Sequence, residues 1–177
     1  NHTLYQDSLG VTPVTAVGQP VGLMLDKSEG LKQGPELVTN GDFSNGTTGW
    51  TALSDTTLSN SNGELLISAG TANVTAGAYQ SVPTVAGKRY TLSFDFTPIV
   101  GSASVRMMTA PNSNTIESLS VSSSGSYSIT FIAATTTSFV NLIYYNSGGQ
   151  SGKFDNISVT EIQGSHATQP TSTKRPI

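Results

Sequence analysis

The chain has 177 residues, enough for one domain with a sizeable core, and 36% of them are apolar while only 11% are charged. The formal net charge is −3 and no basic stripe is present, which argues against nucleic-acid binding. No apolar run approaches the ~20 residues that span a bilayer, which argues against membrane insertion, and the lack of cysteine excludes disulfides and thiolate chemistry.

Residues 1–35 are punctuated by glycine and proline, which break any helix of useful length. The valines of this segment follow neither a period of 2 nor one of 3.6 residues. We predict an extended N-terminal arm that packs on a neighbouring subunit, with a short strand near residues 21–25. A loose terminal tail is the alternative that the sequence leaves open.

Alternation of apolar and polar residues begins in the middle segment, residues 36–162. Residues 64–69, 90–96 and 127–131 alternate in this way, which predicts half-buried antiparallel strands. Residues 138–145 are apolar on both faces, which predicts a central strand covered on both sides or a strand whose outer face binds something. The spacing of these runs predicts about eight strands and an all-β fold, a two-sheet antiparallel β-sandwich.

Two stretches, residues 36–50 and 154–162, mark the beginning and the end of this segment. We predict that they are the first and last strands of the sandwich and run adjacent and antiparallel, so that its two ends lie close together. Residues 163–177 are rich in Gly, Ser, Thr, Gln and Pro, and we predict an extended C-terminal tail without a core of its own.

Four motifs follow one another across the middle segment: Asn40-Gly41-Asp42-Phe43, Gly49-Trp50, Gly87-Lys88-Arg89-Tyr90-Thr91-Leu92-Ser93-Phe94 and Phe154-Asp155-Asn156-Ile157-Ser158-Val159. In order and spacing they resemble the jelly-roll carbohydrate-binding modules that accompany xylanases and related glycanases. The resemblance implies a jelly roll, with carbohydrate binding as the function found in that family.

The flanks contain a second set of motifs: Leu4-Tyr5-Gln6-Asp7-Ser8, Gly10-Val11-Thr12-Pro13-Val14-Thr15-Ala16-Val17-Gly18-Gln19-Pro20-Val21-Gly22, Leu25-Asp26-Lys27-Ser28, Gly164-Ser165-His166-Ala167-Thr168-Gln169-Pro170 and Arg175-Pro176. Together they resemble one segment of tailed-bacteriophage virion proteins, which the middle segment here divides in two. The resemblance implies that the jelly roll was inserted at an exposed turn, which is tolerated when the ends of the inserted domain lie close together.

Asp42 and Asp155 match acidic positions that hold a structural calcium ion in the resembling modules, so the resemblance implies a calcium site at these two carboxylates. The residues themselves leave an alternative open. In that alternative, Asp42 caps a turn and Asp155 belongs to a polar hydrogen-bond network.

Aromatic and polar side chains supply candidates for sugar binding. Trp50 is either a sugar-stacking platform or a plug at the end of the core. Adjacent tyrosines on a strand face opposite ways, so one of Tyr144 and Tyr145 points outward. The candidate carbohydrate-binding residues are Tyr79, Gln80, Arg106, Asn141, Tyr144 and Tyr145, with plain surface tyrosines as the alternative.

The sequence gives little support for an enzymatic function. The sequence contains no Gly-x-Ser-x-Gly motif and no phosphate-binding glycine loop, and its two histidines lie in the flanks. A glycosidase pair stays open, because its two carboxylates meet in space rather than in sequence. The scattered candidates are Asp55, Glu64, Asp95 and Glu117. We predict a chain without enzymatic activity.

We therefore expect a structural component of a bacteriophage virion, in a tail, fibre or capsid-surface assembly, located in the extracellular particle. The arms would contact other virion subunits in a homo-oligomer, and the jelly roll would be displayed for adhesion to host-surface polysaccharide. The alternative is a carbohydrate-binding module of a secreted bacterial glycanase or of a cell-surface protein.

Overall fold

The computed structural model describes residues 4–7, 10–24, 32–72, 74–145, 148–163 and 167–168. The chain divides into a larger unit, residues 35–161, and a smaller unit made of residues 1–34 and 162–177. Regular structure in these ranges consists of β-strands alone, which confirms the all-β prediction. Accordingly, the described residues include no apolar helix of membrane-spanning length.

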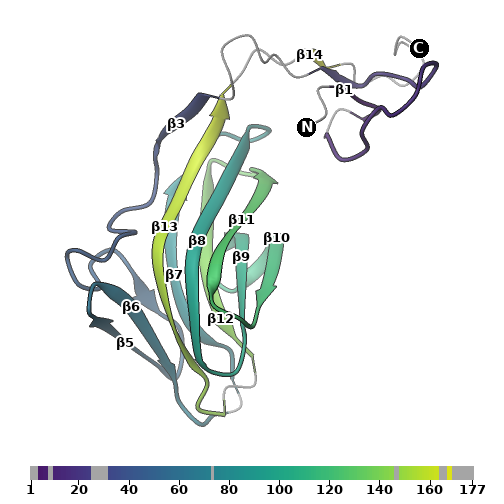
Figure 1. The fold of residues 1–177 in the computed structure, drawn as a ribbon. Coiled ribbons are helices and arrows are strands. Elements are labelled where there is room, and N and C mark those ends of the chain that lie inside the picture. Colours follow the sequence, from purple (N-terminus) through teal and green to yellow (C-terminus); the bar gives the residue numbers. More distant parts are fainter. Residues whose placement is uncertain are drawn as a thin grey trace. The chain divides into compact units, whose positions relative to one another are not determined.

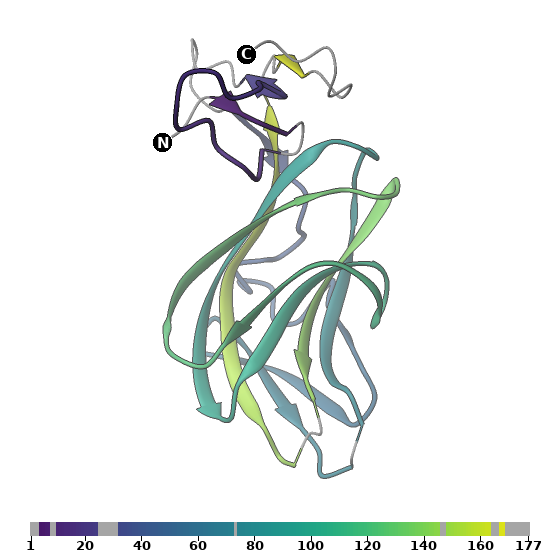
Figure 2. The same cartoon turned by 90° about the vertical axis from the view of Figure 1, so that its right-hand side faces the viewer.

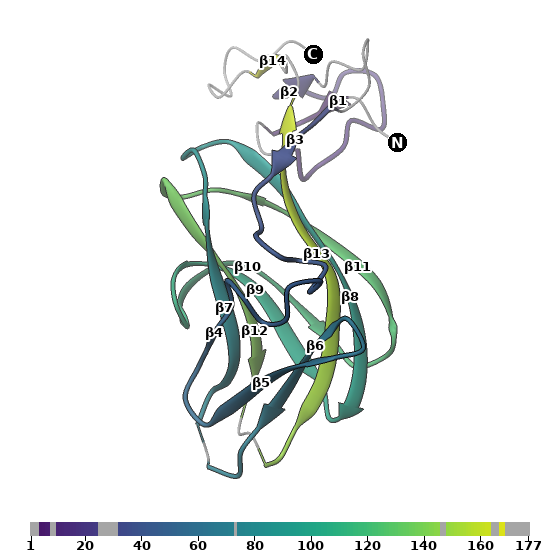
Figure 3. The same cartoon turned by 90° about the vertical axis from the view of Figure 1, so that its left-hand side faces the viewer.

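The strands of the larger unit form two antiparallel sheets (Figures 1 and 3). One has the order β10-β9-β12-β7-β4 and the other the order β11-β8-β13-β6-β5, with β3 paired to β13. The strands are β3 (Lys32–Glu36), β4 (Thr51–Ala52), β5 (Thr56–Ser61), β6 (Glu64–Ala69), β7 (Ala76–Pro83), β8 (Arg89–Val100), β9 (Ala103–Ala110), β10 (Ser113–Val121), β11 (Gly125–Ile132), β12 (Thr137–Tyr144) and β13 (Ser151–Gln163). Figure 2 shows the two layers from the side, and the predicted two-sheet sandwich is confirmed.

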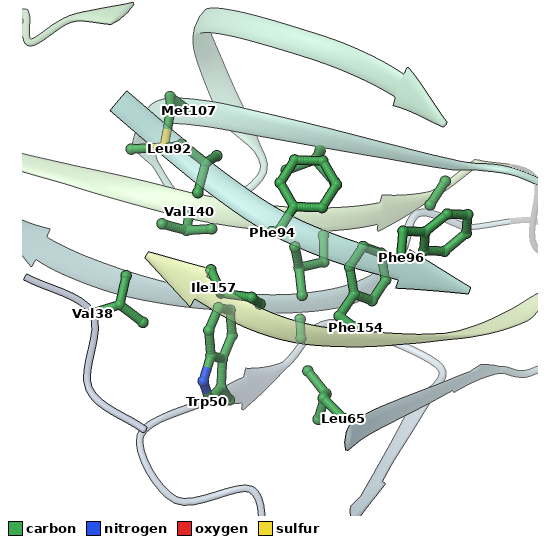
Figure 4. Close-up of a cluster of buried hydrophobic side chains, with 14 of the residues drawn as sticks. Val38, Trp50, Leu65, Leu92, Phe94, Phe96, Met107, Val140, Phe154 and Ile157 are labelled. Atoms are coloured by element: carbon green, nitrogen blue, oxygen red, sulfur yellow. The ribbon is translucent and has the colours of Figure 1, made fainter. Parts of the chain in front are cut away.

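The core lies between the sheets and is filled by alternate residues of facing strands (Figure 4). On β8, the side chains of Tyr90, Leu92, Phe94 and Phe96 are buried, as their period-2 pattern predicts. Phe154 of β13 packs against this row, with its ring centroid 4.8 Å from that of Phe96. These rings join the two middle strands of the β11-β8-β13-β6-β5 sheet into one apolar surface.

The predicted strand at residues 36–50 is wrong, because β3 ends at Glu36 and turns follow up to β4. Asn40, Phe43 and Gly49 have φ angles of 54°, 50° and 86°, which interrupt an extended chain. The predicted antiparallel neighbourhood is nevertheless present. The Leu37 N–H donates to the Val159 carbonyl at 3.0 Å, and the Ile157 N–H donates to the Gly41 carbonyl at 2.9 Å.

Two side chains hold this irregular segment in place. The Glu36 Oε1 atom accepts hydrogen bonds from the N–H groups of Leu37, Val38 and Val159 at 2.8–2.9 Å, so one carboxylate joins the segment to β13. The Asn40 side-chain amide donates to the carbonyls of Gly46 and Thr48 at 3.0 Å and so closes the turn region on itself.

The indole of Trp50 lies in the core rather than on the surface. It is 7% exposed, its ring centroid is 5.6 Å from that of Phe43, and its Nε1–H donates to the Asn40 carbonyl at 3.3 Å. Of the two sequence interpretations for Trp50, the core plug is therefore the one observed.

The smaller unit contains a three-stranded antiparallel sheet of order β1-β2-β14. Its strands are β1 (Leu4–Tyr5), β2 (Leu23–Met24) and β14 (Ala167–Thr168). The short strand predicted near residues 21–25 is confirmed by β2. Because β2 pairs with both β1 and β14, the N-terminal and C-terminal flanks share one sheet. The Asp26-Lys27-Ser28 and Arg175-Pro176 motifs lie outside the described residues.

Tyr144→Phe is expected to raise the free energy of unfolding by about 1 kcal/mol at neutral pH. The Tyr144 hydroxyl is fully buried and has no hydrogen-bond partner, so its removal costs no bond. Burial also raises the pKa of Tyr144 above its ordinary value of 10.0. As pH rises above that value, the phenol ionises in the unfolded chain first and the wild-type protein loses stability. Urea unfolding at neutral and alkaline pH should show a smaller alkaline loss for the variant. A less stable variant at neutral pH would contradict the prediction.

Candidate functional site

The outer face of the β10-β9-β12-β7-β4 sheet brings three of the predicted carbohydrate-binding residues into one cross-strand row. Asn141 of β12 is paired with Tyr79 of β7 on one side and with Arg106 of β9 on the other. Thr51 of β4 pairs with Tyr79, and Ser118 of β10 pairs with Arg106, which extends the row to both edges. Residues paired in register project their side chains to the same face of a sheet, so the members of this row share one face.

Arg106 is held on this face by two hydroxyls and one aromatic ring. Its Nε–H donates to Ser104 Oγ at 3.0 Å, and Nη1 donates to Thr115 Oγ1 at 3.3 Å. Its Cζ lies 4.9 Å from the centroid of the Tyr145 ring, a cation–π arrangement. The guanidinium is therefore fixed in orientation, while Tyr145 keeps 41% of its surface exposed.

Tyr79 provides an aromatic surface further along the same row. Its ring centroid lies 6.3 Å from that of Phe139, which belongs to the outward-facing set of β12, and both side chains are half-buried. This packing limits the rotamers of the Tyr79 ring, so a flat partner would meet a surface that is already ordered.

Three of the predicted carbohydrate-binding residues, Tyr144, Gln80 and Asn141, have side chains that are buried and therefore not accessible to a ligand. These three predictions are corrected. Tyr144 faces the core at 0% exposure, which confirms that it and Tyr145 point opposite ways. Gln80 faces inward at 6% exposure, and its amide bonds to the N–H and carbonyl of Thr39 at 2.7 and 2.9 Å. Gln80 thus ties the turn region to β7.

Asn141 lies on the outer face but is fully buried, and its amide is bound on both sides. Its Oδ1 accepts the Asn112 N–H at 3.0 Å, and its Nδ2 donates to the Phe139 carbonyl at 3.1 Å. Asn112 belongs to the turn between β9 and β10, so Asn141 anchors that turn rather than contacting a ligand.

The sequence analysis did not identify Ser104 and Thr115, the two residues whose hydroxyls orient Arg106. Ser104 lies two residues before Arg106 and shares its face, so the period of a strand could have identified it. Thr115 lies on the next strand, where the register shifts between Thr115 and Glu117. No pattern in the sequence predicts that shift, and Thr115 could therefore not have been assigned to this face.

The two carboxylates of the predicted metal site differ in their hydrogen bonds. Asp155 Oδ1 is buried without a hydrogen-bond partner, and burial, followed by the charges of Glu64, Asp95 and Asp42, raises the pKa of Asp155. An orphaned carboxylate oxygen is an acceptor that a cation would satisfy. Within the described part of the chain, however, no three His, Cys, Asp or Glu residues gather closely enough to hold a metal ion.

Asp42 takes the role that the alternative interpretation gave it. Its Oδ1 caps a turn by accepting the Ser44 N–H at 3.3 Å and the Ser44 hydroxyl at 3.0 Å. Asp42 also lines a recess of about 420 Å³ together with Glu36, Asn40, Asn156 and Ser158, whereas Asp155 does not. The two aspartates therefore present oxygens to different surroundings.

Comparisons with known proteins bear on the fold. No protein-family model matches the chain. No curated protein matches it either. Among solved structures, a CBM4 carbohydrate-binding module is 14% identical, with a TM-score of 0.59, and covers 70% of this chain and 99% of its own.

Two further solved structures are similar over the same share of the chain. The N-terminal cellulose-binding domain of β-1,4-glucanase C from Cellulomonas fimi is 21% identical, with a TM-score of 0.54, and the match covers 73% of this chain and 99% of that domain. TmCBM61, solved with β-1,4-galactotriose, is 15% identical, with a TM-score of 0.52 and coverages of 72% and 99%. At these identities the likeness establishes the fold, and the chain contains the β-sandwich that these carbohydrate-binding modules share.

Proposed function

We propose that the larger unit is a carbohydrate-binding module whose ligand lies across the outer face of the β10-β9-β12-β7-β4 sheet. The observation that supports this most is the register that places Tyr79 and Arg106 in one row, with Tyr145 beneath the guanidinium. Aromatic faces combined with oriented hydrogen-bond donors are what recognition of a sugar ring requires. The likeness in fold to carbohydrate-binding modules supports the same function.

The module is proposed to act by binding alone, because the candidate catalytic carboxylates are engaged elsewhere. Glu64 forms an ion pair with Lys153 at 2.8 Å, and Asp95 accepts a hydrogen bond from Asn156 at 2.7 Å. Asp55 and Glu117 accept backbone N–H groups, from Ala72 and Ser118 respectively. Glycoside hydrolysis needs two carboxylates that face the same ligand. Each of these four carboxylates is instead bonded to a neighbouring protein group.

Tyr79→Ala and Tyr145→Ala are each expected to weaken glycan binding about tenfold, because the first removes an aromatic surface from the row and the second removes the ring that holds the Arg106 guanidinium. Calorimetric titration of the full chain with xylo-, cello- and galacto-oligosaccharides would measure the loss. Val85→Ala is the matched control, since Val85 is an exposed apolar residue at 54% in the turn between β7 and β8. Binding that survives both tyrosine substitutions would place the site elsewhere, and wild-type protein that binds no glycan would reject the function.

We also propose that Asp155 contributes to a calcium site, supported by its orphaned, buried Oδ1 atom. Calcium in hundredfold excess over its dissociation constant is expected to raise the free energy of unfolding by about 2.7 kcal/mol relative to chelator. Asp155→Asn should abolish this difference and, in chelator, be at least as stable as wild type, because a buried charge has been removed. Identical melting temperatures of the wild type in calcium and in chelator would reject the site.

The flanks favour a second proposal, that the smaller unit mounts the sandwich in a bacteriophage particle and assembles with other virion subunits as a homo-oligomer. Its support is the pairing of β2 with both β1 and β14, which unites the two flanks that resemble halves of one phage segment. Sedimentation of the full chain tests the assembly, and a monomer at high protein concentration would count against it.

A further inference from the structure

Arg106 is an isolated charge on the outer face of the β10-β9-β12-β7-β4 sheet. The five strands of this sheet contain one other charged residue, Glu117, which pairs in register with the inward-facing Met107 rather than with Arg106. The ion pairs found in the described parts of the chain join Lys88 to Glu161 and Lys153 to Glu64. Among the residues that the structure describes, the guanidinium of Arg106 is met by the neutral hydroxyls of Ser104 and Thr115 and by the Tyr145 ring, and it forms no ion pair.

The guanidinium retains unused hydrogen-bonding capacity in a fixed direction. An arginine carries five N–H donors, and Ser104 and Thr115 accept from two of them. The remaining donors are on the two terminal nitrogens, where the planar fork matches a carboxylate, sulfate or phosphate group in a bidentate way. The Tyr145 ring against one face of the plane leaves the in-plane edge as the direction of approach.

The distance across the sheet fits a ligand of more than one sugar unit. Arg106 and Tyr79 lie on strands separated only by β12, so their backbones are two strand spacings, or roughly 10 Å, apart. A charged substituent at Arg106 would therefore leave a neighbouring sugar unit within reach of Tyr79.

We propose that the ligand of this face is an anionic glycan, whose carboxylate, sulfate or phosphate substituent binds the free N–H donors of Arg106 while a neighbouring sugar ring lies on Tyr79. This inference rests on the proposed glycan-binding function and specifies its ligand class. A neutral sugar would leave the charge of Arg106 uncompensated, whereas an anionic substituent forms charge-assisted bonds with it.

The test compares ligands that differ in charge but not in length. The full chain is titrated at fixed ionic strength with oligogalacturonate, a sulfated galacto-oligosaccharide, a phosphorylated one and the neutral galacto-oligosaccharide, with free sulfate and phosphate as further probes. At least one anionic glycan is expected to bind about tenfold or more tightly than the neutral one, with affinity that falls as salt rises. The glycan that binds most tightly identifies the substituent.

Arg106→Gln should bring the affinities for the anionic and the neutral glycan of equal length to within about twofold of one another, whatever it does to the affinity for the neutral glycan itself. Arg106→Lys should keep part of the preference for the anionic glycan, since lysine retains the charge but not the planar fork. Lys88→Gln, which removes one positive charge at a site off this face, is the matched control. The preference of the wild-type protein for charged ligands needs no variant, so it tests the inference even where a substitution impairs folding.

The outcomes separate the inference from the function on which it rests. Neutral glycans bound as tightly as anionic ones, with no effect of Arg106→Gln, would overturn the inference and leave the carbohydrate-binding function standing. Free sulfate or phosphate bound as tightly as the charged glycans would also overturn it, because the sugar would then contribute nothing. The absence of binding to every glycan would overturn both.

Discussion

Gly41→Ala is expected to lower the free energy of unfolding of the sandwich by about 3–5 kcal/mol. A Cβ atom at this position would overlap the carbonyl oxygen of Ile157 and approach the Val38 side chain to 3.2 Å. The obstacle is backbone rather than a flexible side chain, and the same two residues share the Ile157 N–H to Gly41 carbonyl bond of 2.9 Å. Relief of the overlap therefore separates the segment after β3 from β13. Urea unfolding followed by tryptophan fluorescence would measure the loss, because Trp50 reports on this region.

Gly125→Ala supplies the matched control for that experiment. A Cβ atom at Gly125 meets its nearest neighbours, atoms of the Tyr127 ring, at 3.7–3.8 Å, which is ordinary contact. We expect a change within about 0.5 kcal/mol. If Gly125→Ala and Gly41→Ala cost the same, the loss of glycine flexibility rather than the close approach to Ile157 would explain both, and the account of the junction would be wrong.

The regular part of the fold could be predicted because its strands bury one face at a time. Residues 64–69 coincide with β6, and the predicted strand at residues 90–96 lies within the longer β8. In both, alternate apolar residues are fully or nearly fully buried. Period-2 alternation is a direct consequence of strand geometry, so a sequence that alternates over six or more residues leaves few competing structures.

The segment between β3 and β4 could not be predicted, because side-chain hydrogen bonds rather than hydrophobic alternation determine it. Asn40 adopts a positive φ angle and bonds to carbonyls five to eight residues away. Gln80 reaches the backbone of Thr39 from a position distant in sequence. Neither arrangement leaves a periodic signal, and the same residues are equally compatible with a strand or with a surface loop.

The motifs that suggested the fold turn out to build the fold rather than a ligand site. Gly41 permits the close approach to Ile157, Phe43 and Trp50 enter the core, and Phe154 packs against Phe96. A resemblance based on such residues is informative about architecture because they are required by packing. It says little about the ligand, since the outer-face residues Tyr79 and Arg106 are not part of any of these motifs.

The candidate site could be predicted only in part, because the orientation of a side chain on a strand does not decide whether it is exposed. Asn141 of β12 and Tyr145, which directly follows β12, both face outward, yet Tyr145 is 41% exposed and Asn141 is 0% exposed. The difference arises from the turn at Asn112, whose N–H bonds to Asn141. A contact between residues 29 positions apart leaves no local signal in the sequence.

Phe154→Ala is expected to cost about 3–5 kcal/mol of the free energy of unfolding, comparable with the loss at Gly41. Phe154 is fully buried, and its ring centroid lies 4.8 Å from that of Phe96 and 6.2 Å from that of Phe94. Truncation removes the transfer free energy of the ring and leaves a cavity among aromatic side chains, which are too rigid to fill it. Chemical denaturation with an unchanged m-value would identify the loss as one of native stability.

Phe154→Leu distinguishes the loss of stability caused by the cavity from the loss caused by the missing ring contacts. Leucine restores most of the buried apolar volume, so we expect a loss of about 1.5 kcal/mol, clearly below that of alanine. The position also bears on the proposed calcium site, because Phe154 directly precedes Asp155 on β13, and the Oδ1 atom of Asp155 is buried without a partner. If Phe154 orders that carboxylate, then the stabilisation by calcium should be smaller in Phe154→Ala than in Phe154→Leu. Equal calcium effects in the two variants would show that the β13 backbone, and not the packing of this ring, orders the proposed calcium site.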